Sequence, residues 1–217
     1  MMKRIVRLAA TVCVAAAVLA LAGPAPADSI TLGVKSLEDL LGAGPTAVDS
    51  VLSTAMNQGN IHAACLSQAY TDGDGHYVYL YQISNTGVTG NSPIEEFTLW
   101  PFAGANNFSD IGCLNETPIG FLGAPDQAPE SDAWVEGLAS GPQISIYYSL
   151  RYHYSVAIGE HSEIMYVASD LPPDVITGSV IDGSVAMGDV VGPLPEPATL
   201  TFLAAGGLVA LARRRRR

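Results

Sequence analysis

The sequence predicts a mainly β protein, an antiparallel β-sandwich of the immunoglobulin-like type with a short N-terminal helix and a single hydrophobic helix at the C-terminus. From Ile61 onward, short runs rich in Tyr, Val, Ile and Phe alternate with Gly, Pro, Asn and Asp, which is the pattern of strands and turns. A helical apolar period occurs only in a short segment before Ile61. We divide the chain into a signal peptide (1–27), a secreted β-rich domain (28–192) and a C-terminal sorting signal (193–217).

The charged residues are unevenly distributed. Eight of the ten Lys and Arg residues lie at the two ends, whereas residues 28–192 carry 20 acidic residues and only two basic ones, Lys35 and Arg151, a formal charge of −18. Nucleic acids and anionic membrane surfaces are bound mainly through clustered Lys and Arg. The central region has no such cluster, so we expect no nucleic-acid partner.

The first 27 residues have the anatomy of a secretory signal peptide. A basic start precedes an apolar stretch, and the small-residue triplet Ala25-Pro26-Ala27 follows it. We therefore expect signal peptidase to cut between Ala27 and Asp28. An N-terminal membrane anchor is the alternative, but the apolar stretch is short for a membrane span and ends in Gly23-Pro24.

One helix is expected between residues 46 and 59. Val48, Val51, Leu52, Ala55 and Met56 recur at helical spacing, and Thr46 and Gly59 occupy positions typical of the two caps. A smaller helical turn is expected to begin at Ser36, because Glu38 and Asp39 would follow it where a helix N-terminus favours negative charge.

A β-hairpin is the clearest element of the central region. Two β-rich runs, 64–70 and 76–84, flank an Asp-Gly turn at 71–75, which is a strong hairpin signal. In the second run the tyrosines and Ile83 alternate with Val78 and Leu80, so both faces are apolar and we expect a central strand. Further strands are expected around 94–102 and at 143–149, 152–158, 163–169 and 175–181, which makes six to eight strands in all.

The C-terminus combines three features. Leu194-Pro195-Glu196-Pro197 precedes an uncharged apolar segment, Ala198 to Ala212, and five arginines close the chain. As a helix this segment would span about 22 Å, which is short of a bilayer core of roughly 30 Å. Basic flanks stay on the cytoplasmic side, so the arginines would place the central region outside. An ordinary tail anchor is the alternative.

This tail resembles the PEP-CTERM sorting signal of Gram-negative bacteria that make extracellular polysaccharide. The resemblance implies recognition by exosortase, a membrane-embedded cysteine peptidase that cuts near the motif and delivers the protein to the cell surface or matrix. It implies a recognition motif, a transient membrane segment at Ala198–Ala212 and a cytoplasmic stop. The motif would be Pro195, Glu196 and Pro197, and the stop Arg213, Arg214, Arg215, Arg216 and Arg217.

The central region also resembles the bodies found above such tails. The run from Tyr77 to Gly87 is similar to their recurring Tyr-x-Tyr-x-Tyr-x-x-x-Asn-x-Gly strand, and Gly178 to Gly183 to a strand and turn that precede the tail. The resemblance implies a β-sandwich.

Two cysteines, Cys65 and Cys113, remain after signal cleavage. An even pair in an oxidising compartment predicts a disulfide between them, which would stabilise the fold by about 4 kcal/mol. Two unpaired buried thiols are the alternative.

We expect no catalytic residues, no metal site and no cofactor. His153, His161 and Glu163 match no organised metal motif, and Asp72 and Asp74 do not fit the calcium-loop template, which favours a solvated turn over a calcium site. We therefore expect an exported surface or extracellular-matrix protein with no enzymatic activity, for which exopolysaccharide is a candidate partner. The alternative is a carbohydrate-binding module, using exposed Tyr, Trp100 or Trp134, or a carbohydrate-active enzyme on the same scaffold.

Overall fold

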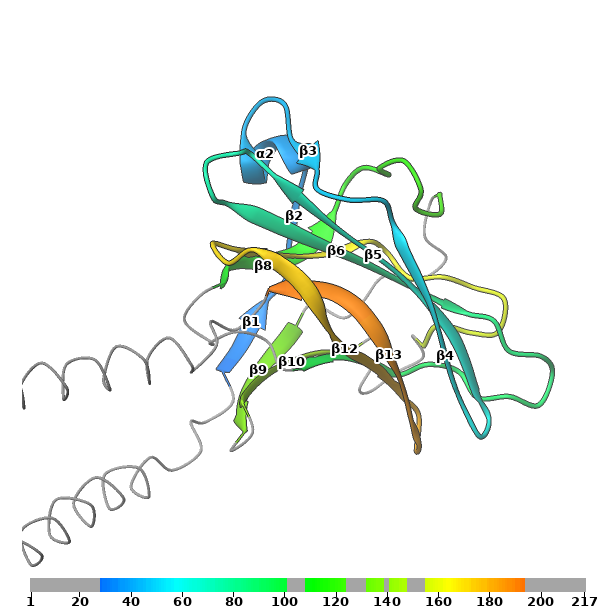
Figure 1. Ribbon diagram of the computed structural model, residues 1–217. Coiled ribbons are helices and arrows are strands. Elements are labelled where there is room, and N and C mark those ends of the chain that lie inside the picture. Colours follow the sequence, from blue (N-terminus) through cyan, green and yellow to red (C-terminus); the bar gives the residue numbers. More distant parts are fainter. Residues whose placement is uncertain (1–27, 101–107, 124–131, 139–140, 148–154, 194–217) are drawn as a thin grey trace, which may run out of the picture.

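The structure, a computed structural model, describes residues 28–100, 108–123, 132–138, 141–147 and 155–193. These residues form two β-sheets and one five-residue helix, so the protein is mainly β as predicted. Figure 1 shows the sheets as two curved layers, with α2 and β3 next to each other at one end of the molecule.

The six-stranded sheet has the order β1-β9-β10-β7-β12-β13. All of its neighbouring strands are antiparallel. Its strands are β1 (Asp28–Thr31), β9 (Asp132–Leu138), β10 (Gly141–Tyr147), β7 (Glu96–Trp100), β12 (Pro173–Ile181) and β13 (Val185–Pro193).

The seven-stranded sheet has the order β2-β8-β11-β6-β5-β3, and β4 pairs separately with β5. The β2–β8 pair is parallel, which departs from the expected all-antiparallel arrangement, and the other pairs are antiparallel. The strands are β2 (Gly33–Lys35), β8 (Phe108–Leu114), β11 (Met165–Ser169), β6 (Tyr77–Asn85), β5 (Ile61–Thr71), β3 (Thr46–Ala47) and β4 (Leu52–Gln58).

The predicted hairpin is confirmed. β5 and β6 pair over nine residues, from Ala63 opposite Asn85 to Thr71 opposite Tyr77. β6 lies between β11 and β5, so it is a central strand, and its two faces enter different hydrophobic clusters. Tyr79 and Tyr81 lie in one cluster and Val78 in the other, as the alternation predicted.

The main core fills the space between the two sheets. Its side chains come from both, and the Tyr81 and Phe97 rings lie 5.6 Å apart across it. We call this cluster the inner core; its largest members include Met56, Tyr79, Tyr81, Ile83, Phe97 and Leu99. One face of each sheet is therefore buried against the other sheet, as predicted.

The helix predicted at 46–59 is wrong, because this segment forms β3 and β4. Met56, in β4, is fully buried in the inner core, while its neighbours in the strand are partly or fully exposed. Gly59, interpreted as a helix cap, has φ 58° and begins the two-residue turn Gly59-Asn60 between β4 and β5. Seven pairs with β5 stabilise the extended form over the short helix that the apolar spacing allowed.

The smaller turn predicted at Ser36 is confirmed as α2 (Leu37–Leu41). The strands expected near 94–102, 143–149, 163–169 and 175–181 correspond to β7, β10, β11 and β12. The strand expected at 152–158 is wrong for the residues described there, since Val156 forms only an isolated bridge with Ile94. The described ranges contain thirteen strands, more than the six to eight expected.

Candidate functional site

The predicted sorting residues lie outside the described part of the chain. This applies to Ala27 and to the whole tail, comprising Pro195, Glu196, Pro197, the Ala198–Ala212 segment and Arg213–Arg217. Asp28, the expected first residue after signal cleavage, begins β1 and lies opposite Val135 in β9. Within the described ranges, no helix has the length and apolar character needed to cross a membrane.

The predicted disulfide between Cys65 and Cys113 is wrong. Both residues are buried free cysteines. Cys65 lies in β5 and Cys113 in β8, and the strands β6 and β11 separate them. Three strand spacings amount to about 14 Å, whereas a disulfide needs its Cα atoms within about 7 Å. The structure therefore matches the alternative of two unpaired thiols.

Asp72 organises the turn between β5 and β6. Its Oδ1 accepts hydrogen bonds from the Asp74 and His76 backbone N–H groups, at 2.7 Å and 3.2 Å, and its Oδ2 lies 2.5 Å from the His76 Nδ1. The hydrogen bond and charge of Asp72 raise the pKa of His76, and the hydrogen bond from His76 lowers the pKa of Asp72. Both Asp72 oxygens are thus engaged within the turn, as expected for a structural role.

The other metal candidates are His153, His161 and Glu163. The described residues contain no group of three or more His, Cys, Asp or Glu side chains placed to hold a metal ion. His161 and Glu163 are described, whereas His153 lies outside the described ranges.

The tryptophans proposed as sugar platforms both lie in the six-stranded sheet. Trp100, at the end of β7, is 38% exposed and lies opposite Thr177. Trp134 belongs to β9, and its side chain is not among those that the structure describes.

On the face of the seven-stranded sheet that points away from the inner core, side chains of α2 pack against the sheet together with Val51 and Phe121. Ser36 is the N-cap of α2. Its Oγ accepts a 3.0 Å hydrogen bond from the Asp39 N–H, and the Asp39 carboxylate accepts one from the Ser36 N–H at 2.9 Å. This capping box satisfies two backbone donors at the helix start. Leu37 and Leu41 are thereby directed into a second cluster with Val78 and Leu80, which we call the outer cluster.

Glu116, in the segment after β8, contacts α2. Its Oε1 accepts a 2.6 Å hydrogen bond from the Leu37 N–H at the start of α2. Glu116 lines two cavities. We call them the larger and the smaller cavity.

The larger cavity has a volume of about 630 Å³. Its walls are mostly apolar, and the polar side chains among them are those of Ser50, Gln68, Tyr70 and Glu116. Ile119, on its rim, is 95% exposed.

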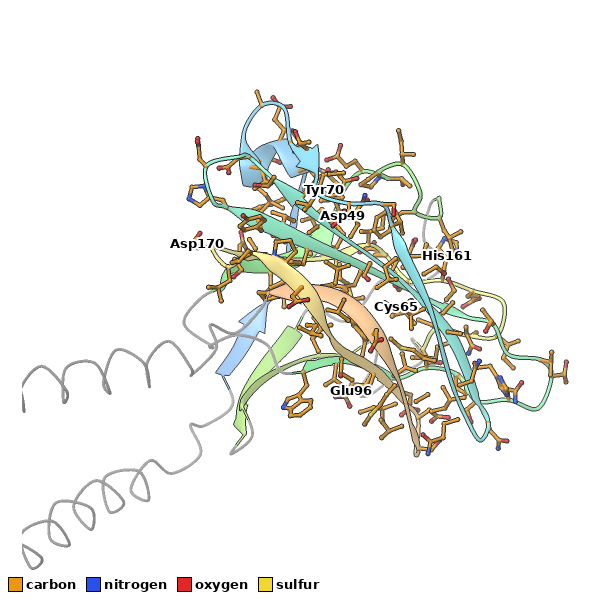
Figure 2. The ribbon with its side chains drawn as sticks, viewed as in Figure 1. Asp49, Cys65, Tyr70, Glu96, His161 and Asp170 are labelled. Carbon is orange, nitrogen blue, oxygen red and sulfur yellow. The ribbon has the colours of Figure 1, made fainter. Side chains whose placement is uncertain are left out.

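Gln68 is the most buried polar residue of this cavity, with only 5% of its surface exposed. Its Nε2 donates a 2.5 Å hydrogen bond to the Asp49 carbonyl oxygen. Because a carbonyl oxygen only accepts, this contact fixes the orientation of the amide. The Gln68 Oε1 is left buried without a hydrogen-bond partner. Figure 2 labels Asp49 and Tyr70 on this side of the molecule.

Tyr70 and Glu116 are electrostatically coupled. Burial and the nearby charge of Glu116 raise the pKa of the Tyr70 hydroxyl above its ordinary value of 10.0. Tyr70 therefore keeps its proton at neutral pH. The lining of the larger cavity thus combines apolar residues with a tyrosine that is neutral at neutral pH and a carboxylate residue.

The smaller cavity has a volume of about 340 Å³. It contains two carboxylates, Glu116 and Glu163, together with Asn115 and Thr117.

Burial and the charge of Glu163 raise the pKa of the Cys113 thiol, so this cysteine is not an activated nucleophile.

Lys35, the sequence neighbour of the lining residue Val34, is already paired. The Lys35 Nζ contacts the Asp110 carboxylate, which also accepts a hydrogen bond from the Tyr166 hydroxyl at 3.3 Å. The described residues lining the two cavities include no Lys, Arg or His. The described lining of these cavities therefore offers no cation for an anionic ligand.

No protein-family model, curated protein or solved structure matches this chain. Its function must be argued from its own residues. Sequence reasoning missed Gln68 and Glu116. Leu66, Gln68 and Tyr70 lie at every second position of β5, so Gln68 is a polar residue in an otherwise apolar row on one face of the strand. That interruption was the one available signal.

Proposed function

We propose that the protein is an exported surface or extracellular-matrix protein of a Gram-negative bacterium, sorted by exosortase through its C-terminus. The observation that carries the proposal is the order of features in the tail: Pro195-Glu196-Pro197, then an uncharged apolar segment, then five arginines. Each feature has a separate physical role in presenting an extended motif at a membrane surface.

Processing in this proposal requires three partners. Signal peptidase removes residues 1–27, the membrane holds Ala198–Ala212 transiently, and exosortase recognises the motif. The cleavage chemistry belongs to the peptidases, so this chain needs no catalytic residue or cofactor for it. The protein is a membrane-anchored precursor first and a surface or matrix protein afterwards.

The central region serves as a stable acidic body under this proposal. The two packed sheets act as a β-sandwich scaffold of the kind found in immunoglobulin-like extracellular domains, although they contain more strands. A formal charge of −18 on residues 28–192 favours solubility among acidic polymers.

The sorting proposal is tested by replacing Pro195, Glu196 and Pro197 with Ala in the native host. We expect an uncleaved precursor that stays in the membrane fraction. Leu194→Ala, next to the motif, is the matched control and should be processed normally. Normal release of the triple variant would refute the proposal.

A carbohydrate-binding module, or a carbohydrate-active enzyme, is the second candidate. It is favoured by the two cavities that share Glu116, the smaller of which also contains Glu163. Glycosidases use two carboxylates about 5–10 Å apart. We propose binding without hydrolysis, and expect no release of reducing ends from the host's exopolysaccharide. Release that is abolished by Glu163→Gln would favour the enzyme.

A further inference from the structure

The chain leaves the folded body at a fixed point. The last strand, β13, ends at Pro193, which is buried and lies opposite Pro173, the first residue of β12. Gly192 is also buried, and a Cβ atom there would lie only 2.2 Å from the Ile176 Cδ1. Close packing therefore sets the position of Pro193, and the tail starts from a defined place on the body.

The sorting motif follows this place almost at once. Leu194 is the single residue between Pro193 and the motif Pro195-Glu196-Pro197. The apolar segment begins at Ala198, directly after the motif. The five residue steps from Pro193 to Ala198 span at most about 18 Å in any conformation. In a membrane-anchored precursor, Pro193 must therefore lie within about 18 Å of the segment that the membrane holds.

The surface around Pro193 is formed by the start of β12 and by the connection that precedes it. Asp170, Asp174 and Val175 are exposed there. Val175 is 56% exposed and lies opposite Val191, two residues before Pro193. Figure 2 labels Asp170 on this side of the molecule. We call this surface, made of residues 170–175 and 191–193, the exit end.

A peptidase that cuts near the motif must also accommodate the exit end. Extended peptide segments are recognised over several consecutive residues. On the N-terminal side of the motif, only Leu194 separates it from the folded body. A cleft that holds the motif and its flanking residues therefore reaches the body itself.

We propose that the exit end is part of the surface that the sorting peptidase contacts, in addition to the motif. This inference rests on the proposed function and adds a contribution of the folded body to substrate recognition. The exit end carries the charges of Asp170 and Asp174 and contains no Lys or Arg. It therefore fits a basic peptidase surface with an apolar contact for Val175, whereas an anionic lipid surface would repel it.

The test is a pulse-chase measurement of precursor processing in the native host, using the full-length protein. Val175→Trp enlarges an exposed side chain of the exit end. We expect it to be processed about fivefold more slowly than the parent, as for disruption of one interface contact.

Met187→Trp is the matched control. Met187 is a 64% exposed apolar residue of the same hairpin, and it lies opposite Ser179, four residues from Val175 along β12. It is outside the exit end, so Met187→Trp should be processed at the parental rate.

A flexible insertion separates loss of contact from misfolding. About twelve Gly and Ser residues placed between Pro193 and Leu194 add about 20 Å, on average, between the exit end and the motif. In that background Val175→Trp should be processed at the same rate as the insertion alone, because the peptidase no longer reaches Val175. Slow processing that persists there would show that the substitution acts through folding, and would overturn the proposal.

The same experiment distinguishes this inference from the sorting proposal. If the alanine variant of Pro195–Pro197 is blocked while Val175→Trp is processed at the parental rate, sorting stands and the role of the exit end is overturned. Faster processing of Val175→Trp would also overturn it, since Trp is favoured at a lipid interface. Normal processing of the alanine variant would refute the sorting proposal, and this inference with it.

Discussion

The two faces of the seven-stranded sheet are closed in different ways. The face toward the inner core is covered by a second sheet, and the β6 side chains directed there, Tyr79, Tyr81 and Ile83, are fully buried. Among the described residues, the opposite face is covered by the five-residue helix α2 and by segments without a second sheet, which include Val51 and Phe121, and two cavities lie on this side. A whole sheet closes a surface completely, whereas a short helix and a loop leave space beside them.

The two faces should therefore differ in how strongly their side chains contribute to stability. The inner core has large side chains in direct contact, so deletions there create new voids. The outer face already has a void lined by polar acceptors and apolar walls. We therefore expect the inner core to determine stability and the outer face to tolerate change.

The largest effect is expected for Phe97→Ala in the inner core. Phe97 is fully buried and its ring lies 5.6 Å from that of Tyr81. Its removal should lower the free energy of unfolding by about 3–5 kcal/mol. Urea denaturation followed by circular dichroism measures this loss. A loss below about 1 kcal/mol would show that the inner core is not closely packed.

A smaller loss is expected for Leu37→Ala on the outer face. Leu37 is buried, but it belongs to a five-residue helix beside an existing cavity, so its surroundings can relax. We expect a loss of about 2 kcal/mol, at the low end for buried leucines. The same urea titration compares it with Phe97→Ala. Equal losses for the two variants would contradict the distinction between the faces.

Thiol labelling compares burial at two positions in the seven-stranded sheet. Burial raises the pKa of both Cys65 and Cys113, and both are free. We expect N-ethylmaleimide to label neither in the folded protein at neutral pH and both in urea, as measured by mass spectrometry. A disulfide-linked peptide containing both cysteines would contradict the strand order.

The smallest effect is expected at the exposed turn between β5 and β6. The pKa of His76 is raised above 6.5, so the contribution of its charge to stability is complete below pH 6.5 and is lost as pH rises through the raised value. The pKa of Asp72 is lowered below 3.8, so its contribution is present above pH 3.8 and is lost as pH falls through the lowered value.

The Asp72→Asn variant tests this pair. It should return the His76 pKa toward its ordinary value, because Asp72 provides the largest contribution to the shift. An NMR titration of the His76 ring protons measures the change. Asp74→Asn, which removes a smaller contribution, is the matched control. An unchanged His76 pKa in Asp72→Asn would show that the turn is not organised as described.

Local signals in the sequence were sufficient to predict some of the strands, turns and helices. The Asp-Gly turn and the alternating tyrosines predicted the β5–β6 hairpin, and Ser36 with its acidic neighbours predicted α2. The 46–59 segment failed because its apolar residues fit a helical period by spacing alone. The segment is extended because it pairs with β5, to which the Gly59-Asn60 turn connects it.

Long-range placement was not predictable from local patterns. The disulfide was predicted from the number of cysteines, but the separation of β5 from β8 depends on strand order, which the sequence does not display. The larger cavity depends in the same way on Glu116 meeting Leu37 across 79 positions of the chain. Neither Glu116 nor Leu37 lies in a local sequence pattern that would predict this contact.

The most direct measurement of the sorting claim is the intact mass of the protein recovered from the surface or matrix of its native host. We expect a chain that begins at Asp28, ends near Pro195–Pro197, lacks the apolar segment and the arginines, and has two free thiols. A recovered mass that still includes Arg213–Arg217 would contradict exosortase sorting.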